Sequence, residues 1–435
     1  MSEISALQLA SVLIFVLALV HTFSTHLFER LAHRSLRHAG LWHLLGEVEV
    51  VFGFWALVLV LCMAVLEDGR QAIEYLETRQ YSEPLFVCVV MVIAASRPIL
   101  ASVQTLLTQM AAGLARILSP LGLSAVWLEC WLGLSALPLL GSLITEPAAM
   151  TLAALLLAPR LFTPAMPERW KYAVLGTLFV NVSIGGTLTA YAAPPVLMVA
   201  NTWGWDSAFM FAHFGQSAVL AVLINATAVC LLTGRFLAQS TAHQPPTPPE
   251  EGSAVSVPWP VTGIHMLFLA LTVLFAHHPV IVMAILLFFL GFTQAYARYQ
   301  SPLILREGLL VGFFLGGLVV LGGMQQWWLQ PLVSSLPPTV LFGGALALTA
   351  ITDNAALTYL GSLIEGIAPL AQYLLVAGAV GGGGLTVIAN APNPAGVALL
   401  RHGLADESVS PWQLFLAALP PTLVAATLFW LNQPG

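Results

Sequence analysis

Long, nearly uninterrupted runs of apolar residues fill most of this 435-residue chain, and short polar stretches separate them. Runs long enough to span a bilayer as helices occur near residues 5–24, 45–66, 84–102, 171–200, 209–233, 260–276, 279–296, 308–325, 369–400 and 411–431. Two longer regions, about 121–160 and 331–367, each predict a pair of spans or a re-entrant hairpin with a broken helix. Since barrel strands would alternate over about ten residues, the pattern predicts an all-α polytopic membrane protein with about 10–14 membrane segments.

Two similar segments recur within these apolar regions. The stretch ITEPAAMTL begins at Ile144, and ITDNAALTY begins at Ile351. Further along, GGTLTAYAAPP begins at Gly185 and GGGLTVIANAPNP begins at Gly382, so that Thr189 matches Thr386. Apolar segments interrupted by Gly and Pro at matching positions of two halves indicate the binding site of a secondary transporter.

Composition supports a membrane location for most of the chain. Hydrophobic residues make up 58% of the sequence and charged residues only 8%, with a mean hydropathy of +0.89. A soluble core could not bury this much apolar surface, so lipid must solvate most of the chain.

The distribution of basic residues predicts an orientation. Arg30, Arg34 and Arg37 lie between the first two runs and place that loop in the cytoplasm, while the following loop is mainly acidic. The N-terminus is then expected outside. Carried along the chain, this orientation keeps the basic clusters on the cytoplasmic side if each ambiguous pair of spans returns to the side it left.

With that orientation, residues 171–200 run outward and their partner segment 369–400 runs inward, so we expect inverted-topology repeats. The Pro-rich stretch 238–260 is typical of an extended linker and would lie in the cytoplasm. We therefore predict a first transmembrane repeat at 1–237 and a second, inverted repeat at 261–435.

Each copy of the motif carries one carboxylate, Glu146 in the first and Asp353 in the second. A charged side chain at the centre of a spanning helix costs about 2.5–3.5 kcal/mol on insertion scales, so neither should face lipid. A carboxylate in a low dielectric is harder to ionise, and proton and cation can then compete for its oxygens. The alternative is a protonated carboxyl that is hydrogen-bonded to the neighbouring backbone and merely tolerated.

The neighbours of the two acids are suited to a cation. Thr145 and Thr352 precede the acids, Asn354 follows the second, and Pro147 takes the equivalent place in the first. Hydroxyl, amide and backbone carbonyl oxygens are hard ligands that suit a small alkali cation. The candidate Na+ ligands are Asp353, Asn354 and Thr386.

The glycine-rich segments predict helices that unwind within the bilayer, because Gly costs about 1 kcal/mol relative to Ala in a helix and Pro removes backbone donors. Freed backbone groups need protein, water or ion partners there. Close helix packing through small residues is the alternative. The candidate residues of this broken-helix cation site are Gly383, Gly384, Thr386, Asn390, Asn393, Gly185, Gly186, Thr187 and Thr189.

On these motifs around 141–200 and 348–400, the chain resembles the ion-transporter superfamily and, within it, the sodium/proton antiporters. The resemblance implies hairpin tips and unwound helices that form ion and substrate sites and move as an elevator against a static scaffold. Thr352, Asp353 and Asn354 match the second motif; Thr145, Glu146 and Pro147 match the first, with Pro where Asn is usual. Arsenite permeases and dicarboxylate or citrate carriers are relatives.

Three functions follow from these observations. The first is exchange of Na+ or Li+ for H+, with Asp353 as the principal shared carboxylate and Glu146 as its counterpart. The second is a sodium-coupled or uncoupled carrier of a carboxylate or oxyanion held at helix ends. The third is a membrane-embedded enzyme or passive channel, which the chain's lack of a Ser-His pair or His-Glu-x-x-His motif disfavours.

The expected partners are the lipid bilayer and the transported ions Na+ and H+. Whether two copies of the chain form a homodimer is left open by the sequence. No cofactor and no nucleic acid partner are expected. We expect an integral, multi-pass protein of a bacterial inner membrane.

Overall fold

The computed structural model describes residues 5–35, 37–118, 120, 122–240 and 256–434, and the ordered elements in these ranges are helices. The first half contains α1 (Ala6–Arg34), α2 (Ala39–Leu45), α3 (Val48–Leu66), α4 (Gly69–Glu77), α5 (Ser82–Ala94), α6 (Arg97–Ile117), α7 (Ala125–Leu134), α8 (Ala136–Ile144), α9 (Glu146–Leu161), α10 (Glu168–Gly185), α11 (Pro194–Trp203), α12 (Ser207–Met210) and α13 (Gln216–Ser240). A 3-10 turn, η2 (Gly186–Leu188), follows α10, and a π turn, η3 (Phe211–Gly215), joins α12 to α13.

The second half has a comparable series of helices. It contains α14 (Trp259–Leu274), α15 (Pro279–Ala295), α16 (Leu305–Gly322), α17 (Gln326–Ser334), α18 (Pro338–Thr349), α19 (Asn354–Ser362), α20 (Pro369–Gly382), α21 (Asn393–Leu400) and α22 (Pro411–Leu431). Short 3-10 turns are η4 (Ala297–Tyr299), η5 (Val387–Ala389), η6 (Arg401–Gly403) and η7 (Ala405–Glu407). Of the predicted linker 238–260, residues 241–255 lie outside the described ranges, and the two ends of the stretch belong to α13 and α14.

By length and composition, six helices of the described chain are able to cross a membrane, or seven if the bent pair α7 and α8 counts as one span. Five further apolar helices of 10–17 residues are shorter. The predicted all-α polytopic membrane protein is thus confirmed.

One predicted span is wrong in its extent. The run 84–102 is not a single helix, because α5 ends at Ala94 and α6 begins at Arg97, with Pro98 in its first turn. Pro lacks a backbone donor and disfavours helical geometry in the residue before it, whereas the first turn of a new helix tolerates it. The apolar segments on both sides of Ser96 and Arg97 had been treated as one run.

In both ambiguous apolar regions the acidic motif lies at the break between the last two helices, which follow α7 in 121–160 and the end of α17 in 331–367. In the first hairpin, α8 and α9 pack together and meet at Thr145. In the second hairpin, residues 350–353 join α18 to α19. The glycine-rich segments unwind as predicted: α10, η2 and α11 form the first broken helix, and α20, η5 and α21 form the second.

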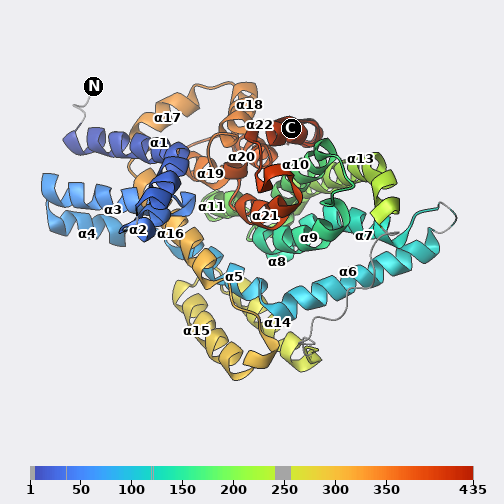
Figure 1. Cartoon of the computed structure of the whole chain (residues 1–435). Helices are drawn as coiled ribbons and strands as arrows, with labels where there is room; N and C mark the ends of the chain where they lie inside the picture. The colour runs from blue at the N-terminus through green and yellow to red at the C-terminus, as the bar shows by residue number, and fades with distance from the viewer. Residues whose placement is uncertain (1–4, 36, 119, 121, 241–255, 435) are drawn as a thin grey trace.

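The hairpins pack against the broken helices of the opposite copy. Helix α9 of the first hairpin lies against α21, and α19 of the second lies against α11, near the middle of the molecule (Figure 1). The broken helices also touch each other, since α10 contacts α20. Through these contacts, helices from both copies of the motif meet near the hairpin tips.

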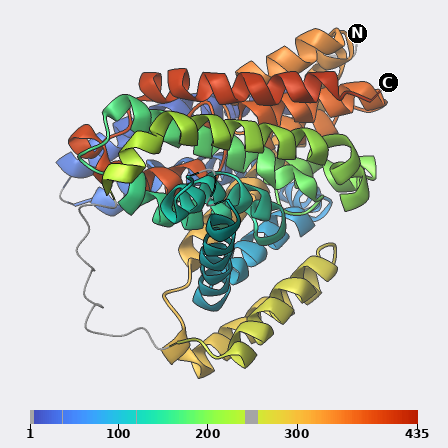
Figure 2. The same cartoon turned by 90° about the vertical axis from the view of Figure 1, so that its right-hand side faces the viewer.

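The remaining helices surround this centre. Helices α1, α3, α5 and α16 form one packed group, and α14 and α15 project at its edge (Figure 1). On the other side, α22 runs alongside α13, as Figure 2 shows, and both pack on α10.

Candidate functional site

Glu146 lies at the tip of the first hairpin, as the first residue of α9, and is fully buried. Pro147 follows it in the first turn, where the missing backbone donor has no helical partner to lose. The break between α8 and α9 therefore places a carboxylate inside the protein.

One oxygen of this carboxylate is held by the other half of the chain. The side-chain amide Nδ2 of Asn390 donates a hydrogen bond of 2.8 Å to Oε2 of Glu146. The second oxygen, Oε1, is buried and has no hydrogen-bond partner among the described residues. A Cβ atom at Gly186 would collide with this carboxylate, so glycine is needed for the close approach of the first broken helix.

Thr145 has an unusual backbone at the same tip. Its φ of 76° and ψ of 152° belong to a region that is essentially restricted to glycine, and β-branched residues are disfavoured there. The side chain is buried, and its hydroxyl has no partner among the described residues. The protein thus stores strain where it presents a hydroxyl beside Glu146.

Asp353 has a different environment at the matched tip. It is half-buried and caps α19, because its Oδ1 accepts hydrogen bonds from the backbone amides of Ala355, at 2.8 Å, and Ala356, at 3.1 Å. Thr352 is also half-buried and donates to the carbonyl of Leu348 at 3.0 Å. One oxygen of Asp353 is therefore held by its own helix, whereas the bonded oxygen of Glu146 takes its donor from the other half of the chain.

The first broken helix is fastened to the first hairpin by Ser142, a residue that the sequence analysis did not select. The hydroxyl of Ser142 donates to the carbonyl of Gly185 at 2.7 Å and accepts from the amide of Leu188 at 2.9 Å. Thr189 then donates to the carbonyl of Ser142 at 2.7 Å. Thr187, in contrast, is buried and bonds within its own turn, to the carbonyl of Ile184. Ser142 aligns with Thr349, a hydroxyl residue of the second copy, which was the available signal.

The second broken helix is fastened in a similar way. Thr386 donates to the carbonyl of Ala350 at 2.9 Å, next to the second hairpin's turn. Asn393 donates to the carbonyls of Gly383, at 2.8 Å, and Thr386, at 2.9 Å, and so satisfies backbone groups that the unwinding releases. At Gly384, a Cβ would collide with the backbone of Val180 on α10.

Asn354 lies where the two broken helices cross. It is fully buried, and its amide is 3.5 Å from the hydroxyl of Ser183, which in turn donates to the carbonyl of Val380 at 2.8 Å. A Cβ at Gly383 would collide with Ser183. Ser183 is a second site residue that sequence reasoning missed, because nothing in its aligned partner, Val380, marks it.

The two matched carboxylates differ in their partners for a reason visible in the alignment. Asn390, which holds Glu146, aligns with Ala193 in the first broken helix. A methyl group cannot donate a hydrogen bond, so the second hairpin has no equivalent of that contact. The two matched hairpin tips therefore carry chemically unequal carboxylates.

Several buried oxygens in this region accept no hydrogen bond from the described residues. They are Glu146 Oε1, Thr145 Oγ1, Asn354 Oδ1, Asn390 Oδ1 and Asn393 Oδ1. Buried acceptors without partners are costly, and carboxylate, amide and hydroxyl oxygens are ligands that hard cations prefer. The arrangement is thus chemically able to receive a desolvated cation or a proton on Glu146.

Comparisons with known proteins cover almost the whole chain. A family model described as "Putative Na+/H+ antiporter" matches residues 6–432. Among solved structures, the Alcanivorax borkumensis YdaH transporter matches with 15% identity and a TM-score of 0.42, over 88% of this chain and 96% of that chain. Comparison with curated proteins returned no match.

Proposed function

Since the chain belongs to the family described as "Putative Na+/H+ antiporter", we propose that it exchanges Na+ or Li+ for H+ by alternating access, with intramembrane carboxylates shared between cation and proton. It is a membrane transporter and not an enzyme. The observation that carries the proposal is the buried carboxylate of Glu146, with one oxygen held by Asn390 and the other without a partner.

The two carboxylates have separate roles in this proposal. Asp353 is the principal shared carboxylate: it is half-buried, its Oδ1 caps α19, and its Oδ2 is the oxygen that we propose to bind the cation. Asn354 and Thr386 are its proposed neutral ligands, beside the same turn. Glu146 is the counterpart that takes up a proton or cation inside the protein, with Asn390 as its positioning residue.

Alternating access is proposed to move the hairpins and broken helices together. Each hairpin packs on a broken helix of the other copy, so one cannot shift without the other. This packing supports an elevator movement in which the hairpins and broken helices of the proposed inverted repeats, 1–237 and 261–435, move against the group formed by α1, α3, α5 and α16. We further propose a bacterial inner membrane location with the N-terminus outside, and a homodimer.

The alternative, a carrier of a carboxylate or oxyanion, receives less support. Such a substrate would need the free backbone amides at the start of a half-helix. At α19, Asp353 already occupies the amides of Ala355 and Ala356. A second negative charge there would be repelled.

The test is cation-triggered proton movement in proteoliposomes. Wild type, Asp353→Asn and Glu146→Gln receive Na+, Li+ and K+ in turn, at several pH values around neutrality. We expect Na+ or Li+ to dissipate a preset pH gradient in wild type, and both variants to lose this response. Glu67→Gln, at an exposed acid between α3 and α4, is the matched control and should behave as wild type.

The outcomes separate the alternatives. Unchanged exchange in Asp353→Asn would remove that residue from the proposed role. If no cation moves protons in wild type, antiport is wrong, and sodium-dependent uptake of dicarboxylates and oxyanions becomes the next measurement.

A further inference from the structure

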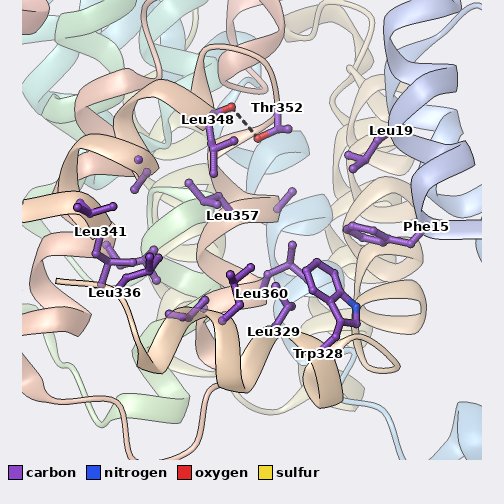
Figure 3. Close-up of a pocket in the computed structure, with 18 of the residues that line it drawn as sticks. Phe15, Leu19, Trp328, Leu329, Leu336, Leu341, Leu348, Thr352, Leu357 and Leu360 are labelled. Atoms are coloured by element: carbon purple, nitrogen blue, oxygen red, sulfur yellow. Dashed lines mark hydrogen bonds between the residues drawn. The ribbon is translucent and has the colours of Figure 1, made fainter. Parts of the chain in front are cut away.

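A cavity of about 300 Å³ lies between the second hairpin and the helices beside it. Phe15 of α1 and Phe52 of α3 line one side, Trp328 of α17 lies at the base, and Leu348 and Leu357 of the hairpin line the other. Figure 3 shows these hairpin side chains facing Phe15 and Trp328 across the space. The cavity ends at Thr352, directly before Asp353.

The chemistry of the lining excludes a polar guest. Nearly every residue is aliphatic, aromatic or glycine. The two polar side-chain groups are already paired: Thr352 donates to the carbonyl of Leu348, and Trp328 donates to Oε1 of Gln325 at 2.9 Å. A water molecule needs two or more polar partners, and apolar cavities stay dry. Only an apolar guest would restore the dispersion contacts that the lining atoms lack.

The cavity opens on a surface that suits lipid. Leu332, Val340 and Leu348 belong to the lining and expose 52%, 50% and 46% of their surface. In a multi-pass membrane protein such exposed aliphatic side chains face hydrocarbon, and the flexible apolar molecules available there are acyl chains. A cavity of this size is within the range that holds small ligands.

We propose that this cavity is a binding site for one acyl chain of a membrane phospholipid, inserted between α1, α3 and α17 on one side and the second hairpin on the other. The bound chain fills the space against which α18 and α19 rest. It reaches the turn that carries Thr352 and thus separates the hairpin tip from the neighbouring helices. This site is independent of which ion the protein carries.

Trp328 provides the readout, because its ring lines the cavity. The full-length protein is reconstituted with phosphatidylcholine that carries bromine atoms midway along the acyl chain, which quench nearby indole fluorescence. The fluorescence of Trp328 is obtained by subtracting the spectrum of the Trp328→Phe variant from that of wild type. We expect strong quenching of this component, and native mass spectrometry of protein in mild detergent should retain one phospholipid.

Two adjacent glycines of α18 provide a matched pair of variants. A Cβ at Gly344 or Gly343 meets no atom within 4 Å, but only Gly344 lines the cavity. Gly344→Leu should therefore fill the cavity, remove the quenching of Trp328 and lose the retained lipid. Gly343→Leu should keep both. Val340→Phe, at the rim, is the second filling variant if Gly344→Leu does not yield folded protein.

Three results would overturn the proposal. The first is equal quenching of Trp328 in wild type and the filling variants, which would indicate only the general lipid surroundings. The second is the absence of quenching in wild type. The third is a change from dimer to monomer in Gly344→Leu without lipid loss, which would assign the cavity to a second copy of the chain.

Discussion

Ser183 on the first broken helix donates a hydrogen bond of 2.8 Å to the carbonyl of Val380 on the second. The two residues are 197 positions apart, which is the offset that also relates Thr189 to Thr386. Residues at corresponding positions of two copies meet each other only close to an axis that relates the copies. The contact is the one expected if the axis of the proposed repeat passes where α10 contacts α20.

Matching glycines support the same relationship. A Cβ at Gly185 would collide with the carbonyl of Pro138 on α8, and one at Gly382 with the carbonyl of Leu346 on α18. Each broken helix thus approaches the backbone of the first helix in its own hairpin. The frameworks of the two sites are alike, whereas their carboxylates have different partners.

Asn390→Ala tests the contact across the copies. The variant leaves Oε2 of the buried Glu146 without a donor, which should cost about 1–3 kcal/mol of stability and abolish or strongly reduce exchange. Thermal unfolding in detergent and proteoliposome transport measure the two effects. Asn201→Ala, at an exposed Asn, is the control.

The double variant Glu146→Gln with Asn390→Ala sharpens that test. If the two side chains act through their mutual hydrogen bond, the stability losses of the single variants should not add. Additive losses would show that Asn390 stabilises the protein through another contact.

Gly186→Ala tests the close approach to Glu146. The added methyl group would collide with the carboxylate, so we expect the carboxylate to be displaced and exchange to fall sharply. Gly343→Ala adds the same group where no atom lies within 4 Å, and exchange should be retained. Transport by Gly186→Ala at the rate of Gly343→Ala would contradict a role for this carboxylate geometry.

Thr145→Gly should increase stability, because glycine adopts the observed backbone without the strain of about 1–3 kcal/mol expected for other residues. If the buried hydroxyl contributes to the ion site, the same variant should need more Na+ for half-maximal exchange. Thr145→Ser keeps the hydroxyl and serves as the comparison. A destabilised Thr145→Gly would mean that the hydroxyl or methyl group contributes more than the strain costs.

Tyr75 gives a pH-dependent prediction outside the candidate spans. It lies on α4 and donates to the carbonyl of Val320 on α16 at 2.6 Å, and burial raises the pKa of Tyr75 to about 12. The unfolded value is about 10, so this contribution to stability is complete below about pH 10 and is lost as pH rises to about 12. Tyr75→Phe should lose about 0.5–1.5 kcal/mol at neutral pH.

Chemical unfolding at neutral and alkaline pH measures this difference. The stability gap between wild type and Tyr75→Phe should narrow over the alkaline window, because only wild type has this phenol to ionise. A gap that is constant with pH would show that Tyr75 titrates alike in the folded and unfolded chains.

Local sequence was sufficient for the membrane class, the helical fold and the breaks in the two glycine-rich segments. Uninterrupted apolar runs have no stable alternative to helices in a bilayer, and clusters of Gly followed by Pro weaken a helix locally, although the single helix α22 accommodates Pro420 and Pro421. The acids Glu146 and Asp353 were recognisable because each stands at the same place in the two similar motifs. The break between α5 and α6 was missed because the short polar interruption at Ser96 and Arg97 lies between two apolar segments that were treated as one run.

Tertiary packing decided which residues meet at the site. Asn390 reaches Glu146 over 244 positions of sequence, and Ser142 and Ser183 gain their roles only because helices from separate segments come together. A hydrogen bond between distant segments requires both partners to lie at the right distance. The local sequence around one partner gives its secondary structure but not which distant residue lies beside it. The unequal partners of Glu146 and Asp353, and the apolar cavity beside the second hairpin, therefore emerge only in the folded molecule.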